Sequence, residues 1–454
     1  MQLKKEQFLR ELPAGFIEDL PDKCGIYAVG GSVRDSLLPD IAPRELDLLV
    51  TKIPLKKLLI ALRRFGTANL VGRSFAVIKW YPDGFDPIDV SLPARRDISL
   101  PDGCEIDPEL PIEEDLGQRD FTVNAIAMDL KNGDLLDPFS GIRNLSDGKL
   151  VAITENSLSA DPIRCLRAAY ICARCRLQPD NKTLDYIKSS ARKLPEMATE
   201  RIAEELKKLL LELPQPSDAL RFWRDWGLLK IILPELAEGV GVVQEGGWHA
   251  FDVFEHNLHT VDAAPPELEI RLAALLHDVG KPRRKRLVPE KDKATFYGHQ
   301  NLGERMAKKV LTRLKFPNDL TDRVARLVRF HMFNRCETDK GVRRFIRNVG
   351  ADLLDSLFAL RFADIVAQGT DRDESSDREY FAEIQSILEN KPPLTTEDLA
   401  VTGYDIMNIL EIESGPGVGE VLNYLMDRVI DNPDLNDREI LIDLIEKFQN
   451  RNKI

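Results

Sequence analysis

Two neighbouring stretches of sequence decide the fold at the start of this chain: Tyr27-Ala28-Val29-Gly30-Gly31-Ser32-Val33-Arg34-Asp35 and Glu45-Leu46-Asp47-Leu48-Leu49-Val50. The first predicts a short apolar strand, a double-glycine turn and the start of a helix. The second predicts another strand, on which Glu45 and Asp47 share one face because strand side chains alternate. A glycine turn that leads into a helix offers backbone N–H groups to an anion. Together the two stretches predict a nucleoside triphosphate held by its phosphates beside metal ions.

The bulk composition is that of a globular protein with several domains. The chain has 454 residues, enough for roughly three domains, and is 43% hydrophobic and 30% charged. Residues 1–15 contain no apolar core of a signal peptide, and no apolar run approaches the roughly 18 residues of a membrane span. Six cysteines in so long a chain do not form a disulfide framework. We therefore expect a cytoplasmic protein without membrane contact.

Charge is distributed unevenly along the chain. The net charge is −12, yet residues 281–348 carry 20 Lys or Arg against 7 Asp or Glu, a local excess of +13. A basic stretch of this size predicts contact with a nucleic-acid phosphate backbone, and the alternative is an ordinary solvated helical surface. The acidic balance of the whole chain argues against a protein that binds nucleic acid over its entire surface.

The hydrophobic pattern divides the chain into an α/β head and a long helical body. Residues 1–20 predict one short amphipathic helix. Residues 24–137 alternate short apolar runs with turn signals, and residues 71–81 and 88–92 predict two strands joined by a turn. Residues 123–130 fit either a strand or a helix. The body that follows has a helical period almost to the end of the chain.

Three carboxylates of the head are candidates for a catalytic metal site. Glu45 and Asp47 share a strand face, and Asp89 lies in another predicted strand. Nucleotidyl transfer requires negative charge to be neutralised on the attacking and leaving oxygens, which two metal ions held by shared carboxylates achieve. The sequence therefore predicts Mg²⁺ at these residues, whereas the alternative is an acidic strand face that is only solvated.

Four motifs, in order along the chain, give a family resemblance. They are residues 29–35 (VGGSVRD) with the acidic pair, residues 114–125 (EDLGQRDFTVNA), residues 161–168 (DPIRCLRA), and a helix that starts near residues 200–202 (ERI). Together they resemble the class II tRNA nucleotidyltransferases (CCA-adding enzymes) and the bacterial poly(A) polymerases. The resemblance covers nearly the whole chain.

The resemblance implies an α+β fold, in which a polymerase-β-like head with a mixed sheet and helices precedes a long all-α body. It implies addition of C, C and A to tRNA 3′ ends from CTP and ATP, without a template and with Mg²⁺ in the head. It also implies nucleotide contacts by Gly30, Gly31, Arg34, Arg119, Asp120, Asn124, Asp161, Arg164 and Arg167.

Physical chemistry supports roles for Asp161 and Arg164 independently of the resemblance. Asp161 lies near the N-cap of a predicted helix with Pro162 in its first turn, and Arg164 lies on the same face three residues later. An aspartate accepts a hydrogen bond from an exocyclic amine, and an arginine donates one to a ring nitrogen. C and A present an amine beside a ring acceptor, whereas U and G present a carbonyl beside an N–H. Such a pair selects C and A without a template; the alternative is an ordinary intrahelical ion pair.

Several positions depart from the usual pattern of the family. Glu45 stands where an aspartate is usual, Gln118 where an arginine is common, and Ala160 where a glutamate is often found. The loop at residues 97–112, which in the family helps to switch from C to A addition, is acidic and short. These departures leave open whether the chain adds the whole CCA sequence or is a specialist for CC or for A.

All six histidines of the chain lie between residues 249 and 331. Residues 275–281 (LLHDVGK) place histidine beside aspartate after an apolar run, a pairing that suits a divalent transition metal. The stretch resembles the HD phosphohydrolase domain that some bacterial CCA-adding enzymes carry. The resemblance implies four metal ligands: His256, His277, Asp278 and Asp364. It leaves open whether a second metal position is completed by His299 and His331. The alternative is a metal-free structural remnant in an RNA-binding body.

We expect four segments along the chain. They are a nucleotidyltransferase head at residues 1–150, a helical neck with the nucleotide-selecting helix at 151–238, an HD domain at 239–375 and a C-terminal helical tRNA-binding region at 376–454.

Two other functions fit the sequence. One is an HD phosphohydrolase whose degenerate head only binds RNA, for which Glu45 is the best support. The other is a poly(A) polymerase that adds long A tails to unstructured RNA. The sequence leaves the oligomeric state open.

Overall fold

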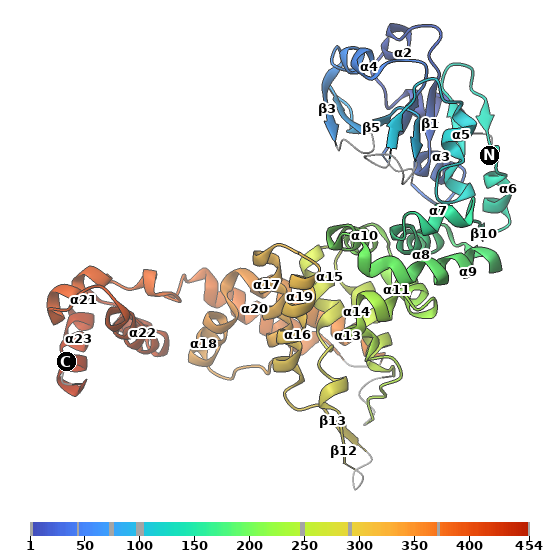
Figure 1. The fold of residues 1–454 in the computed structure, drawn as a ribbon. Helices are drawn as coiled ribbons and strands as arrows, with labels where there is room; N and C mark the ends of the chain where they lie inside the picture. The colour runs from blue at the N-terminus through green and yellow to red at the C-terminus, as the bar shows by residue number, and fades with distance from the viewer. Residues whose placement is uncertain are drawn as a thin grey trace. The chain divides into compact units, whose positions relative to one another are not determined.

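The computed structural model describes residues 3–42, 45–71, 77–96, 104–245, 250–288, 293–369 and 373–452. The chain forms two compact units (Figure 1). The first unit comprises residues 1–209 and 218–234, and the second comprises residues 210–217 and 235–454. In the described part of the chain, no helix is both long and apolar enough to cross a membrane.

A mixed sheet forms the centre of the first unit. Its strand order is β3-β4-β5-β2-β1-β8-β9. The neighbours β2 and β5 run parallel, and the other pairs are antiparallel. The strands are β1 (Ile26–Val29), β2 (Asp47–Val50), β3 (Gly66–Val71), β4 (Val77–Pro82), β5 (Ile88–Ser91), β8 (Ala127–Asp129) and β9 (Leu135–Leu136).

The sheet confirms the mixed-sheet head and refines the strand predictions. The predicted hairpin is present as β4 and β5, but the sequence analysis missed β3, which pairs with β4. Residues 123–130 divide between a 3-10 turn, η1 (Thr122–Asn124), and β8. A small part of the predicted loop at 97–112 belongs to β7 (Cys104–Ile106), and its last residue begins α5 (Ile112–Leu116), while residues 97–103 lie outside the described residues.

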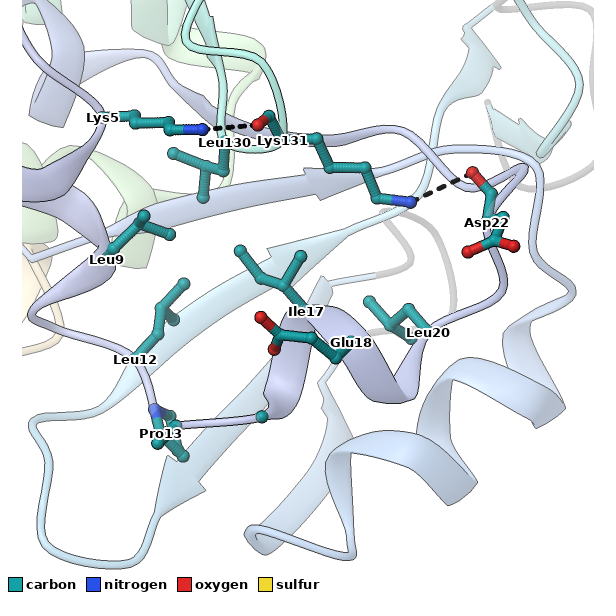
Figure 2. A pocket seen from close by; sticks show the side chains of 12 residues that line it. Lys5, Leu9, Leu12, Pro13, Ile17, Glu18, Leu20, Asp22, Leu130 and Lys131 are labelled. Atoms are coloured by element: carbon teal, nitrogen blue, oxygen red, sulfur yellow. Dashed lines mark hydrogen bonds between the residues drawn. The ribbon is translucent and has the colours of Figure 1, made fainter.

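The single helix expected over residues 1–20 is wrong. The structure has two short helices, α1 (Glu6–Leu9) and α2 (Phe16–Asp19), because Pro13 and Gly15 (φ +81°) separate them. Figure 2 shows the hollow of about 450 Å³ that they line together with Leu130 and Lys131. Phe16 of α2 packs against Trp80, with ring centroids 4.6 Å apart, so these helices complete the core of the sheet.

Helices and two small sheets make up the rest of the first unit. The helices are α3 (Gly31–Ser36), α4 (Leu55–Leu62), α5, α6 (Gly141–Ser146), α7 (Glu155–Ser159), α8 (Ile163–Cys175), α9 (Asn181–Ser190) and α12 (Leu229–Ile232), with α10 (Thr199–Glu212) and α11 (Pro216–Asp225) shared between the units. The small sheets pair β6 (Ala94–Arg96) with β7, and β10 (Lys149–Leu150) with β11 (Gln178–Pro179).

The second unit is predominantly helical, as expected for the body. α14 packs against α15 and α19, and α16 packs against α17. Its elements are α13 (Pro234–Ala237), α14 (Val253–Ala263), α15 (Leu268–Leu276), α16 (His299–Arg313), α17 (Asn318–Phe330), α18 (Asp339–Val349), α19 (Leu354–Ala367), α20 (Ser375–Glu389), α21 (Gly403–Leu410), α22 (Pro416–Asp431) and α23 (Arg438–Asn452), with a hairpin of β12 (Arg286–Val288) and β13 (Lys293–Thr295). The helices α21, α22 and α23 enclose a hydrophobic core of their own.

Candidate active site

The glycine turn between β1 and α3 lies beside the start of β2. Gly30 has a φ of +73°, a conformation that side chains other than glycine rarely adopt. A Cβ atom at Gly30 would lie 3.0 Å from Nη1 of Arg119 and 3.6 Å from Oδ2 of Asp47. The turn therefore requires glycine both for its backbone conformation and for the close approach of a cation and a carboxylate.

Two of the predicted metal carboxylates lie side by side. Asp47 in β2 and Asp89 in β5 are register partners in the parallel pair, so their side chains occupy the same face. Asp89 Oδ1 lies 2.7 Å from Nζ of Lys79. The hydrogen bond to Asp89 raises the pKa of Lys79, and the charges of Asp89 and Glu45 add to this effect. Adjacent carboxylate oxygens are the ligands that Mg²⁺ prefers, so this pair fits the metal that the family resemblance implies.

Glu45 does not share a strand with Asp47, contrary to the prediction. It is exposed and precedes β2, which begins at Asp47. On one side, β1 ends at Val29 before the glycine turn, and on the other, the residue two before Asp89 is Pro87, which has no N–H to donate to a ladder. Strand pairing therefore stops short of Glu45, although its charge still reaches Lys79.

A chain of hydrogen bonds runs from the glycine turn to the neck helices. Arg34, which is buried, donates to Oδ1 of Asn124 at 2.6 Å, and Asn124 donates to Oδ1 of Asp120 at 2.9 Å. Arg167 of α8 donates to Oδ2 of Asp120 at 3.4 Å and to Oε1 of Glu205 on α10 at 3.3 Å. Each guanidinium is thus held in place by a carboxylate or amide oxygen.

Asp120 is ionised at the centre of this chain of hydrogen bonds. Burial raises its pKa, but the positive charges of Arg167 and Arg164 and the hydrogen bond from Asn124 outweigh burial, so the net shift of the pKa is downward. A buried carboxylate in this setting keeps the surrounding arginines ordered.

Asp161 and Arg164 are ion-paired, with Asp161 Oδ2 3.8 Å from Arg164 Nε. Asp161 also accepts a hydrogen bond from Arg201 at 2.8 Å, while Arg164 donates to the backbone oxygens of Ser157 at 2.9 Å and Gln118 at 3.2 Å. Asp161 lies next to Pro162, the N-cap residue of α8, as predicted, and no side chain caps this helix, which begins at Ile163. The Asp161 carboxylate contacts Arg164 and Arg201.

One cavity of about 480 Å³ brings most of the predicted nucleotide-side residues together. Its wall includes all but two of the residues predicted to bind the nucleotide or its metal: Gly30, Gly31, Arg34, Asp47, Asp89, Arg119, Asp120, Asn124, Arg164 and Arg167. Among the described residues, Glu45 and Asp161 are the two predicted residues outside this wall. Several guanidinium groups thus face the same space as two adjacent carboxylates, an arrangement suited to a triphosphate and its cation.

Four histidines of the second unit present the same ring nitrogen to one shared space. In each, Nδ1 faces a backbone oxygen: Ala274 for His277 at 2.8 Å, Phe296 for His299 at 2.9 Å, Val328 for His331 at 2.8 Å and Ala367 for His256 at 3.4 Å. A hydrogen bond from Nδ1–H leaves Nε2 as the acceptor, which is the tautomer that binds a metal.

Asp278 lies at the centre of this histidine cluster. Its Oδ2 is 3.3 Å from Nε2 of His277, and its Oδ1 is 3.3 Å from Nε2 of His299 and 3.6 Å from that of His331. Two groups of potential metal ligands therefore share Asp278: His256 and His277 form one with it, and His299 and His331 form the other. The cluster opens on a cavity of about 740 Å³.

The remaining predicted ligand completes the first group. Asp364 of α19 has Oδ1 3.0 Å from Nε2 of His256. Burial lowers the pKa of His331 to about 4, so that this imidazole is neutral at neutral pH and available to a cation. His259 stacks on Phe251, with centroids 4.1 Å apart, and is not part of either ligand group among the described residues, while His249 lies outside them.

Family models and known proteins match this chain over most of its length. Three family models match it: "Poly A polymerase head domain" over residues 26–151, "Probable RNA and SrmB- binding site of polymerase A" over residues 176–239, and tRNA nucleotidyltransferase domain 2 over residues 293–445. The A-adding tRNA nucleotidyltransferase of Deinococcus radiodurans is 36% identical over 330 residues, which are 70% of this chain and 75% of the relative. The CC-adding tRNA nucleotidyltransferase of Thermus thermophilus is 36% identical over 416 residues, 88% of each chain.

The chain belongs to the tRNA nucleotidyltransferase family. The crystal structure of the Bacillus stearothermophilus CCA-adding enzyme in complex with CTP has the same fold, with a TM-score of 0.68 and 22% identity over 97% of both chains. Membership makes this chain a nucleotidyltransferase, whose family uses a divalent metal in the head.

The sequence analysis missed several residues that line or support the candidate active site. Tyr170 and Lys208 line the head cavity, with Nζ of Lys208 4.9 Å from the centre of the Tyr170 ring. Asp35 accepts a hydrogen bond from Arg34, and Glu205 accepts one from Arg167. One signal was available: Arg201, Glu205 and Lys208 are spaced to share one face of the helix predicted there.

Proposed function

We propose that this chain adds C and A nucleotides to the 3′ end of tRNA, using CTP and ATP without a template and releasing pyrophosphate. The observation that carries the proposal is the single cavity shared by the glycine turn, the carboxylates Asp47 and Asp89, and the arginines of α8. Its 36% identical relatives bear names for A-adding and CC-adding activity. We also propose that the protein acts in the cytoplasm.

In this proposal the carboxylates hold Mg²⁺ and the glycine turn and arginines hold the triphosphate. Asp47 and Asp89 would bind the metal, with Glu45 close enough to contribute charge. The metal supplies charge neutralisation on the attacking 3′-oxygen and the departing pyrophosphate. The amides at Gly30 and Gly31, with Arg34 and the other cavity arginines, orient the phosphates for in-line attack.

We infer that the base is read by Asp161 and Arg164. Asp161 accepts from the exocyclic amine and Arg164 donates to the ring acceptor, a pattern that C and A share. Arg201 supports this role because its hydrogen bond fixes the Asp161 carboxylate. U or G would leave these polar groups mispaired, at a cost of about 1–3 kcal/mol for each group.

We assign residues 1–150 to the head, 151–238 to the neck, 239–375 to an HD domain and 376–454 to a tRNA-binding region. The basic balance of residues 281–348 supports RNA contact by the body.

Incorporation into three tRNA transcripts tests the proposal. One lacks CCA, one ends in C and one ends in CC, and each is incubated with labelled CTP, ATP or both. Addition of three nucleotides to the first identifies a complete CCA-adding enzyme, and addition of CC alone or of A alone identifies a specialist. An unstructured RNA is the control. Long A tails on that RNA, or no incorporation into any tRNA, would contradict the proposal.

The histidine cluster supports a second candidate function, a metal-dependent phosphohydrolase in the body. Four Nε2 atoms and two buried aspartates, Asp278 and Asp364, surround one space that opens on a cavity. A divalent transition metal bound there would activate water for attack on a phosphoester. His256, His277, Asp278 and Asp364 are the proposed first ligand set, and His299 and His331 the second.

Hydrolysis of a chromogenic phosphomonoester and of 2′,3′-cyclic nucleotides tests this second function. The protein is first stripped with a chelator and then supplied with Mn²⁺, Co²⁺ or Ni²⁺. Activity that returns with metal and is lost in Asp278→Asn supports it. A protein that binds metal but hydrolyses neither substrate would make the cluster a structural site.

A further inference from the structure

Asp35, the residue that follows Arg34, is completely buried between two arginines. Arg34 donates from Nε to Oδ1 of Asp35 at 2.8 Å, and Arg174 donates from Nε to Oδ2 at 2.9 Å. Both oxygens of the carboxylate are therefore charge-paired, as a buried carboxylate requires. The orientation of Arg34 consequently depends on a carboxylate that Arg174 holds from the other side.

Arg174 makes a second contact that also leads toward the active site. Its Nη2 donates to the backbone oxygen of Ala42 at 2.9 Å, five residues before Asp47. One planar guanidinium thus fixes the end of the glycine-turn helix and the segment that enters the metal-binding strand. A lysine could not make both bonds with the same geometry.

Arg174 lies on the same helix, α8, as the cavity arginines Arg164 and Arg167. Arg164 and Arg167 lie in the first turns of α8, and Arg174 lies in its last turn. At about 1.5 Å per residue, Arg174 lies roughly 15 Å along the helix axis from Arg164 and roughly 10 Å from Arg167. The end of α8 that faces the base and the end that supports the phosphate-binding turn are therefore parts of the same element.

We propose that Arg174 is a positioning residue for nucleotide transfer, which acts through Asp35 to hold Arg34 in place for the triphosphate. Among the described residues, the cavity wall includes Arg34 but neither Asp35 nor Arg174, so Arg174 acts without touching the substrate. The inference rests on the proposed role of Arg34 as a triphosphate contact. It adds that α8 carries both a proposed base-reading residue, Arg164, and the support of the proposed phosphate contact Arg34.

Arg174→Met tests the proposal, because it should weaken binding of the triphosphate and leave the other binding properties unchanged. The KM for CTP is expected to rise about 10- to 100-fold, because Arg34 loses its fixed orientation. Binding of CMP, which lacks the β and γ phosphates, the preference for C over U, and tRNA affinity are expected to stay unchanged. Arg174→Lys, which keeps the charge next to Asp35, should recover part of the loss. Arg143→Met, at a side chain 83% exposed on α6, is the matched control.

A double-mutant cycle with Arg34→Met decides whether Arg174 acts through Arg34. The double variant is expected to lose no more CTP affinity than Arg34→Met alone. Losses that multiply, or an equal loss of CMP binding in Arg174→Met, would overturn the inference. If Arg174→Met does not fold, as judged by circular dichroism, the same cycle is run with Arg174→Lys.

The cycle also separates this inference from the proposed function. If Arg34→Met lowers CTP affinity and the Arg174 variants do not, the inference alone fails. If Arg34→Met itself leaves CTP affinity unchanged, the assigned triphosphate contact is wrong, and the inference that rests on it fails too.

Discussion

At the scale of single residues, we expect nucleotide addition to depend most on the carboxylate of Asp47. It lies within the cavity, beside the glycine turn and next to Asp89. Asp47→Asn keeps the shape of the side chain but removes a charged metal ligand, whose contribution to the transition state is several kcal/mol. We expect incorporation of CMP into tRNA to fall at least about 100-fold, since each 1.36 kcal/mol is a factor of ten.

Two variants serve as comparisons for Asp47→Asn. Asp83→Asn changes an exposed carboxylate in the turn after β4 and should leave activity unchanged. Glu45→Gln should have an intermediate effect, because Glu45 acts on the site through its charge rather than from the cavity wall. Near-normal incorporation by Asp47→Asn would show that the metal is held elsewhere.

Arg164 is the residue on which base selection should depend. Its guanidinium is held by the Ser157 and Gln118 backbone oxygens, so its direction is fixed before a nucleotide binds. Arg164→Met removes the donor, and we expect the preference for CTP over UTP to fall roughly 10- to 100-fold, which corresponds to one or two mispaired polar groups. The measurement is kcat/KM for both nucleotides on the same transcript. An unchanged ratio, with lower rates for both, would assign Arg164 to general binding.

Asp120 should make the stability of the first unit depend on pH. Although its burial opposes ionisation, Arg167 and Arg164 hold its pKa below the ordinary value. The carboxylate is therefore stabilising above its unfolded pKa of about 4, and this contribution is lost as the pH falls through the folded pKa. We expect Asp120→Asn to lower the free energy of unfolding by about 1–3 kcal/mol at pH 7 and by less below pH 4.

Urea unfolding followed across this pH range checks the prediction for Asp120. Asp134→Asn, at an exposed carboxylate of the same unit, is the control. A deficit of Asp120→Asn that stays constant from pH 7 to pH 3 would show that charge is not the cause.

At the scale of elements, the sequence predicted local structure well and missed contacts between distant segments. The glycine turn was evident because Gly30 and the apolar run before it lie within a few residues, and α8 was evident from its period and its start. The pairing of Arg34 with Asn124 joins residues 90 apart, and that of Arg174 with Asp35 joins residues 139 apart. Such partners depend on how strands and helices assemble, which no local pattern contains.

The position of Glu45 shows why the alternation of strand side chains was not sufficient to place it in the same strand as Asp47. Its spacing from Asp47 is that of one strand face, but a residue belongs to a strand only where a neighbouring backbone can pair with it. The glycine turn on one side and Pro87 on the other end that pairing. The histidine cluster was predicted more completely, because the motif LLHDVGK gave a resemblance to the HD domain, and that resemblance implied the distant ligands as well.

Metal binding should stabilise the second unit, because the ligands of the histidine cluster come from several helices. The ligands come from α14, α16 and α19 and from the residues that follow α15 and α17. A cation held at 100 times its Kd stabilises the folded state by about 2.7 kcal/mol. For a unit of this size we expect a rise in Tm of roughly 5–10 °C on addition of Mn²⁺ to chelator-treated protein. His277→Ala should abolish the shift and His259→Ala should not; equal shifts in both would place the metal elsewhere.

At the scale of the whole molecule, the two proposed activities belong to different compact units. The head cavity is built within the first unit and the histidine cluster within the second. The sheet of the head and the helices α21 to α23 also have separate hydrophobic cores. Because the two sites lie in different units, a substitution that alters the chemistry of one site is expected to leave the other site intact.

This separation predicts that each activity can be removed alone. Asp47→Asn should lose nucleotide incorporation and keep phosphoester hydrolysis within about a factor of two, and His277→Ala should do the reverse, because the effects of independent sites add to within roughly 0.5 kcal/mol. Both activities are measured on the same preparations, with tRNA lacking CCA and with a chromogenic phosphomonoester. If His277→Ala also abolished incorporation while the protein stayed folded, the histidine cluster would have to act on tRNA addition itself, and hydrolysis would no longer be an independent function of the body.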